Sequence, residues 1–144
     1  MKSYFPDINV WLALTYRGHQ HHTVAAQWFD QLQNDTACFC RFTQLGFLRL
    51  LTYPQIMADE ARTQAEAWKV YDDLNSDMRV IFCPEFDPDA IETELRDLTT
   101  KARSAPQQWP DAYLAAFAYA ENLILVTFDR ALSKLARSQV LLLK

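Results

Sequence analysis

Glycine is the residue that this sequence most clearly lacks, because only Gly18 and Gly46 occur in 144 residues. The dinucleotide-binding fingerprint needs several closely spaced glycines, and the phosphate-binding P-loop needs two glycines followed by a lysine. Neither pattern can be written with these two positions. Enzymes that hold a nucleotide cofactor on a glycine-rich turn are therefore excluded.

Cysteine and long apolar runs are also scarce. Cys38, Cys40 and Cys83 are an odd number and too few for a disulfide scaffold, and we interpret Cys38 and Cys40 as buried, inert thiols. No segment approaches the ~20 apolar residues that a membrane-spanning helix needs, and the N-terminus shows no apolar leader. We therefore expect a cytoplasmic protein that has no membrane contact.

Basic residues are outnumbered by acidic ones, with 14 Lys and Arg against 18 Asp and Glu and a formal net charge of −4. This balance argues against passive nucleic-acid binding, which relies on clusters of Lys and Arg. It leaves room for a nuclease, because carboxylates that hold a divalent cation add negative charge where such an enzyme acts. Half of the residues are hydrophobic, which at this length indicates one globular domain over residues 1–144.

Hydrophobic patterning predicts strands and helices in alternation. Short apolar runs predict strands at 3–6, 37–40, 80–83, 123–127 and 140–143. Helices are expected at 9–14, at 23–33 and from 43 to just before Pro54, then at 62–75, from 88 to about 101, from 111 and from 130, with a loop at 104–110. Continuous apolar strands separated by helices are typical of a parallel sheet covered on both faces. We therefore expect a three-layer α/β/α sandwich with a central, mainly parallel sheet.

Three aspartates are expected near the carboxyl edge of that sheet, where ligands of open α/β sheets bind. Asp7 follows the first strand, Asp129 follows the strand at 123–127, and Asp111 opens a helix whose loop can reach the same edge. Clustered carboxylates repel one another and favour a hard cation such as Mg²⁺ or Mn²⁺, which supports phosphodiester hydrolysis. The alternative interpretation is that Asp111 and Asp129 only cap helices.

Four segments, in order along the chain, resemble PIN-domain toxins of the VapC type. They are residues 6–14 (PDINVWLAL), 43–51 (TQLGFLRLL), 111–116 (DAYLAA) and 126–130 (VTFDR). The resemblance implies a PIN-like fold and a metal-dependent endoribonuclease that uses Mg²⁺, or Mn²⁺, to activate water. It also implies an RNA substrate, a cognate antitoxin protein that inhibits the toxin, and a homodimer.

Carried over residue by residue, the resemblance assigns Asp7, Asp111 and Asp129 as catalytic and metal-binding residues. Asn9 and Thr127 would support them through hydrogen bonds. Many PIN domains carry a glutamate in the second segment, where this chain offers only Gln44 or Gly46, depending on the register. Gln44 is kept as a supporting polar residue, and the missing carboxylate leaves a catalytically degenerate RNA- or protein-binding module as the alternative function.

Other residues have weaker claims on function. Arg130, Arg49 and Trp109 are candidate RNA contacts. Arg130 is equally well explained as part of a solvated helix face, Arg49 can instead contact the antitoxin, and Trp109 is better explained as packing its loop onto the core. The histidines at 19, 21 and 22 lack the partners of a zinc site and are interpreted as a polar loop, from which His21 or His22 can still reach RNA. A phosphatase of the haloacid-dehalogenase type would need an aspartate where Asn9 stands, which disfavours that class.

Overall fold

A computed structural model describes residues 1–101 and 103–144 and contains a five-stranded sheet. Its strands are β1 (Ser3–Pro6), β2 (Thr36–Phe39), β3 (Val80–Phe82), β4 (Ile124–Thr127) and β5 (Val140–Leu142). They lie in the order β3-β2-β1-β4-β5, and every neighbouring pair is parallel. The predicted parallel sheet is confirmed, with each strand within one residue of its expected bounds.

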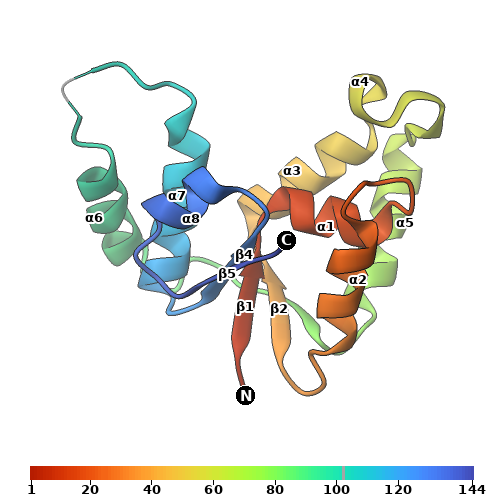
Figure 1. Ribbon diagram of the computed structural model, residues 1–144, viewed down its shortest axis with the longest axis horizontal. Helices are drawn as coiled ribbons and strands as arrows, with labels where there is room; N and C mark the ends of the chain where they lie inside the picture. Colours follow the sequence, from red (N-terminus) through yellow and green to blue (C-terminus); the bar gives the residue numbers. More distant parts are fainter. Residues whose placement is uncertain (102) are drawn as a thin grey trace.

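Helices cover both faces of the sheet, as Figure 1 shows. One layer contains α1 (Ile8–Thr15), α2 (His22–Asp30), α3 (Arg41–Leu51), α4 (Pro54–Met57), a 3₁₀ turn (Ala58–Glu60) and α5 (Gln64–Asn75). The other contains α6 (Pro88–Leu98), α7 (Gln108–Ala120) and α8 (Arg130–Leu135). The chain therefore adopts the expected three-layer α/β/α sandwich. In the part of the chain that is described, no helix is long and apolar enough to cross a membrane.

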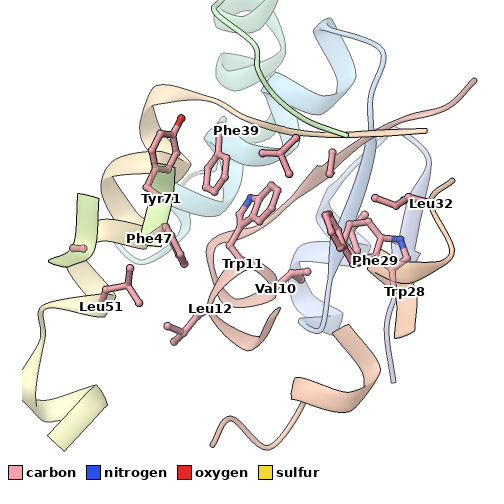
Figure 2. Close-up of a cluster of buried hydrophobic side chains, with 14 of the residues drawn as sticks. Val10, Trp11, Leu12, Trp28, Phe29, Leu32, Phe39, Phe47, Leu51 and Tyr71 are labelled. Atoms are coloured by element: carbon pink, nitrogen blue, oxygen red, sulfur yellow. The ribbon is translucent and has the colours of Figure 1, made fainter. Parts of the chain in front are cut away.

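Alternation along the strands divides the core into two clusters, because successive side chains of a strand point to opposite faces. Phe39 of β2 belongs to the cluster under α1, α2, α3 and α5, where its ring stacks on Trp11 at 3.9 Å between centroids (Figure 2). Cys38, its neighbour, belongs to the cluster under α6, α7 and α8. Cys38 and Cys40 are both buried, as predicted.

Helix bounds are where the sequence analysis was wrong. Helix α2 ends at Asp30 and α6 at Leu98, each about three residues before its expected end. A helix was expected from residue 43, but α3 starts at Arg41, and the Thr43 hydroxyl accepts a hydrogen bond from the Cys40 backbone N–H at 2.9 Å. A helix was expected from residue 23, but Thr23 lies inside the first turn of α2, after His21 at the cap position. In both cases the threonine is a residue of the first turn, so the helix begins earlier than the nearest good cap residue suggests.

The start of α7 needs a similar correction. Residues 104–110 were expected to form a loop before a helix beginning at Asp111, but α7 begins at Gln108. Proline is tolerated in the first turn of a helix, where its missing N–H would have no intrahelical partner. Pro110 therefore lies inside α7, and Trp109 belongs to a helix rather than to a loop.

Candidate active site at the carboxyl edge of the sheet

The strand order sets where a ligand site is expected. The chain passes from β1 to β2 through helices on one face and reaches β4, on the other side of β1, through helices on the opposite face. The strand order therefore changes direction between β1 and β4. A change of this kind opens a crevice at the carboxyl ends of the two strands, which is the usual ligand site of open α/β sheets. Asp7 directly follows β1, and Asp129 lies two residues beyond the end of β4.

Asp7 is buried and held at both carboxylate oxygens. It occupies the N-cap of α1, where Oδ1 accepts a hydrogen bond from the Val10 N–H at 3.2 Å. Oδ2 accepts a short hydrogen bond from the hydroxyl of Thr127, at the end of β4. Thr127, which was predicted to support the aspartates, thus contacts Asp7 directly, and this hydrogen bond connects the ends of β1 and β4.

The pKa values show that this carboxylate is costly to ionise. Burial raises the pKa of Asp7 from 3.8 to about 6, although hydrogen bonds from Thr127 and Val10 oppose the rise. The negative charge of Asp129 adds to it. A buried acid whose pKa is raised by burial and by a like charge is typical of a functional site.

Asp129 caps α8, as the sequence alternative proposed, and it also lines the same cavity as Asp7. Its Oδ1 accepts hydrogen bonds from the N–H groups of Ala131 at 2.8 Å and Leu132 at 3.4 Å. Its own N–H donates to the Thr127 hydroxyl at 3.0 Å. Because Thr127 also donates to Asp7, a chain of hydrogen bonds runs from one aspartate to the other.

Asp111 is placed differently from the other two aspartates. It is half-buried in the first turn of α7 and does not cap that helix. Burial raises its pKa, and the charge of Asp129 raises it further, so the two carboxylates are close enough to repel. Nevertheless, no group of three Asp, Glu, His or Cys side chains among residues 1–101 and 103–144 is arranged to hold a metal ion by itself.

A cavity of about 310 Å³ opens over Asp7 and Asp129. Asn9, another predicted supporting residue, lines it together with His19, Gln20, His21 and Phe128. The histidine loop that was interpreted as a polar connection is therefore one wall of the site. Phe128 was not singled out from the sequence, although its place between Thr127 and Asp129 was the available signal.

Gln44 does not lie in this cavity. Its buried side chain accepts a hydrogen bond from Arg41 and lies beside the Tyr71 side chain of α5, so it packs between α3 and α5. At Gly46 a Cβ would overlap Ile8 Cδ1 and lie 2.9 Å from Ile8 Cγ1, so any side chain there would require the Ile8 side chain to move. Close packing of α1 on α3 thus occupies the position where a second-segment glutamate would need room.

The predicted RNA contacts lie outside the cavity lining. Arg130 is exposed at the first position of α8, next to Asp129. Arg49 lies on α3, where its guanidinium carbon is 5.6 Å from the centre of the Tyr53 ring. Trp109 is 59% exposed and borders a separate hollow with Lys101 and Arg103.

Comparison with known proteins identifies the family. The PIN domain family matches residues 4–138, and the chain belongs to this family. It is 37% identical over 132 residues to Ribonuclease VapC41 of Mycobacterium tuberculosis, covering 89% of this chain and 90% of that protein.

Solved structures share the fold at lower identity. VapBC2 from Rickettsia felis, solved with a DNA fragment from its promoter, aligns with a TM-score of 0.71 at 14% identity and covers 99% of both chains. VapC20 of Mycobacterium tuberculosis, described as a sarcin–ricin loop cleaving toxin, aligns with a TM-score of 0.63 at 17% identity over 91% of this chain and 93% of that one. The predicted PIN-like fold is confirmed.

The donor set of the cavity fits a hard divalent cation. Asp7, Asp129 and Asn9 offer carboxylate and amide oxygens to one space, and Mg²⁺ in proteins is commonly bound by one or two carboxylates while it keeps several waters. Burial raises the pKa values of Asp7 and Asp111, and the negative charge of Asp129 raises both further, so a bound cation would stabilise the ionised carboxylates. A site with few protein ligands and several waters agrees with the lack of a three-residue cluster in the described chain.

Proposed function

We propose that this PIN-domain protein is a ribonuclease that hydrolyses RNA phosphodiester bonds with Mg²⁺ or Mn²⁺ and acts as the toxin of a toxin–antitoxin pair. The observation that carries the proposal is the cavity shared by Asp7 and Asp129 at the switch between β1 and β4. The 37% identity to a VapC ribonuclease over most of both chains supports the same reaction.

Each site residue has a definable task in this reaction. Asp7, Asp129 and Asn9 would hold the divalent cation, with Asp111 close enough to act through water. A bound cation would supply an activated water and neutralise charge on the phosphate. Thr127 orients Asp7 through its hydroxyl and accepts from the Asp129 N–H, so it fixes the spacing of the two carboxylates. The N-terminus of α8 stabilises the negative charge of Asp129.

The reaction is tested with purified protein and total RNA in Mg²⁺, in Mn²⁺ and in EDTA. Asp129→Asn retains a good N-cap residue but removes a carboxylate from the cavity, and we expect it to lower cleavage by at least 100-fold. Asp111→Asn tests the residue that does not line the cavity. Asp87→Asn is the matched control, because Asp87 caps α6 through the Ala90 N–H at 3.1 Å and is exposed away from the cavity.

Three results would contradict the proposal. Cleavage that persists in EDTA would exclude a divalent cation as the agent. Full cleavage by folded Asp129→Asn would exclude the cavity as the site, and absence of cleavage by the folded wild type would favour a degenerate binding module.

An antitoxin protein is the proposed partner. Two of the solved structures with this fold are complexes, VapBC2 from Rickettsia felis and FitAB, each bound to DNA. In the present chain, α3 and α5 form a groove lined by apolar and polar side chains, among them Leu45, Leu48, Arg49 and Trp68. Leu45 is 57% exposed and Trp68 is 47% exposed, which suits an amphipathic helix of the partner.

Co-expression with the product of a neighbouring short reading frame tests this partner. We expect a complex that co-purifies and that suppresses RNA cleavage, and light scattering on the free protein tests the homodimer that the VapC resemblance implies. Trp68→Ala should weaken the complex while leaving cleavage by the free protein unchanged. Equal binding by Trp68→Ala and the wild type would move the partner away from this groove.

A further inference from the structure

The three histidines of the loop between α1 and α2 have different structural roles. The His22 side chain anchors the start of α2, because its Nδ1 lies 2.8 Å from the Ala13 carbonyl oxygen. The His19 side chain closes a turn, because its Nδ1 accepts from the His21 N–H at 3.0 Å. The His21 side chain makes no capping hydrogen bond to α2, although it occupies the N-cap position. The hydrogen bonds of His19 and His22 thus hold the loop in place, and the His21 ring is not used to cap α2.

The His21 ring stacks on Phe128 at the wall of the aspartate cavity. The two ring centroids are 4.4 Å apart and the planes differ by 17°. Both residues line the cavity that contains Asp7 and Asp129, and both remain partly exposed. The two aromatic rings therefore lie beside the carboxylates of Asp7 and Asp129.

We propose that the His21–Phe128 pair is a stacking platform for one nucleobase of the RNA, next to the phosphate that is cleaved. The proposal rests on the ribonuclease function given above and specifies the substrate as RNA with an unpaired nucleotide at the cut. Proteins that recognise single-stranded RNA commonly stack its splayed bases on Phe, Tyr, Trp or His. Stacking tolerates any base, because every base has a π face.

The size of the cavity supports an unpaired nucleotide. About 310 Å³ lies at the lower end of the range for small-ligand sites, so the cavity has room for one nucleotide. Bases in an A-form duplex are stacked on their neighbours and present only their edges. The platform therefore selects loops, bulges and single strands at the site of cleavage.

Single-turnover cleavage of an unpaired RNA oligonucleotide pool in Mg²⁺ tests the platform. The variants are His21→Ala, which removes the ring, and His21→Phe, which keeps a stacking surface without the imidazole nitrogens. Phe86→Ala is the control, because Phe86 is 75% exposed and its side chain does not border this cavity. Thermal melting verifies that each variant is folded.

We expect His21→Ala to raise the protein concentration for half-maximal rate by about 10-fold or more, with a smaller change in the maximal rate. His21→Phe should restore most of this loss, Phe86→Ala should match the wild type, and the wild type should cut a fully paired duplex poorly. Wild-type behaviour of His21→Ala, or no rescue by His21→Phe, would overturn the platform while leaving the Asp129→Asn result to decide the ribonuclease function.

A binding measurement decides the platform even if the wild type cleaves nothing. An oligoribonucleotide pool with a central 2-aminopurine is titrated with the wild type and with His21→Ala, because stacking of this base on an aromatic ring quenches its fluorescence. Quenching by the wild type that is lost in His21→Ala supports the platform. No quenching by the wild type, or equal quenching by both proteins, overturns it.

Discussion

Replacing Asp7 by Asn should stabilise the folded protein at neutral pH while removing the proposed activity. Asn is as good an N-cap residue as Asp, so the start of α1 is retained. The gain comes from removing a carboxyl whose pKa burial raises from 3.8 to about 6. Because one pKa unit corresponds to 1.36 kcal/mol, this rise means that ionised Asp7 lowers the free energy of unfolding by about 3 kcal/mol.

The sign of the pH dependence follows from the direction of the shift. Because the pKa of Asp7 is higher in the folded protein than in the unfolded chain, the wild type has its full stability from this group below about pH 4 and loses it as pH rises through about 6. The Asn variant has no such loss. The free energy of unfolding of Asp7→Asn, relative to that of the wild type, should therefore increase by about 2.5 kcal/mol between pH 4 and pH 8, because part of the effect is already present at pH 4.

Urea unfolding of both proteins at several pH values in EDTA measures this difference. The amide of the variant does not titrate, so a weaker hydrogen bond to Thr127, worth about 1 kcal/mol, lowers its stability equally at every pH. The pH dependence of the wild-type bond is already contained in the pKa of Asp7, so the slope is unchanged. Asp87→Asn is the control for loss of a cap carboxylate at an exposed site. A relative stability of Asp7→Asn that stays flat from pH 4 to pH 8, or falls, would refute the account of Asp7 as a strained buried acid.

Three further substitutions test other parts of the structure by urea unfolding. Gly46→Ala should fail to give the gain of about 1 kcal/mol that alanine brings over glycine in a helix interior, because its Cβ would overlap and displace the isoleucine at the start of α1; stabilisation by that full amount would contradict the close packing of α1 on α3. Thr127→Val should cost about 1–3 kcal/mol at pH 8 and less at pH 4, where Asp7 is protonated and needs the donor less; an equal cost at both pH values would contradict the bond. Arg137→Ala should destabilise by about 1–3 kcal/mol, because buried Glu94 would lose the partner of its Oε1, and Glu94→Gln in that background should recover part of the loss; no recovery would contradict this cause.

Much of the fold was predictable because hydrophobic patterning is a property of the sequence itself. Each strand was expected within one residue of its observed bounds, since apolar runs of four or five residues between helices leave few other interpretations. Helix starts were less predictable, because a threonine can reach back from the first turn, as Thr43 does, instead of capping. A proline can also lie inside the first turn, as Pro110 does in α7.

The site was predictable in part, for a topological reason. Asp7 and Asp129 follow strands that are adjacent in the sheet, so the carboxyl-edge rule was enough to bring them to one cavity. Gln44 was assigned to the site from the resemblance, yet its partners are Arg41 and Tyr71, because the direction of a helix face depends on packing between α3 and α5. The stack of His21 on Phe128 joins a loop to the end of β4, and no local pattern encodes that contact.

The most direct test of the central claim is single-turnover RNA cleavage by the wild type and by Asp7→Asn over a range of Mn²⁺ concentrations at pH 7.5. The account predicts cleavage by the wild type that rises with Mn²⁺ and is abolished by EDTA. It predicts no cleavage by Asp7→Asn at any Mn²⁺ concentration, in a protein that is more stable than the wild type. Cleavage by Asp7→Asn at the wild-type rate would contradict the assignment of the β1–β4 cavity as the active site.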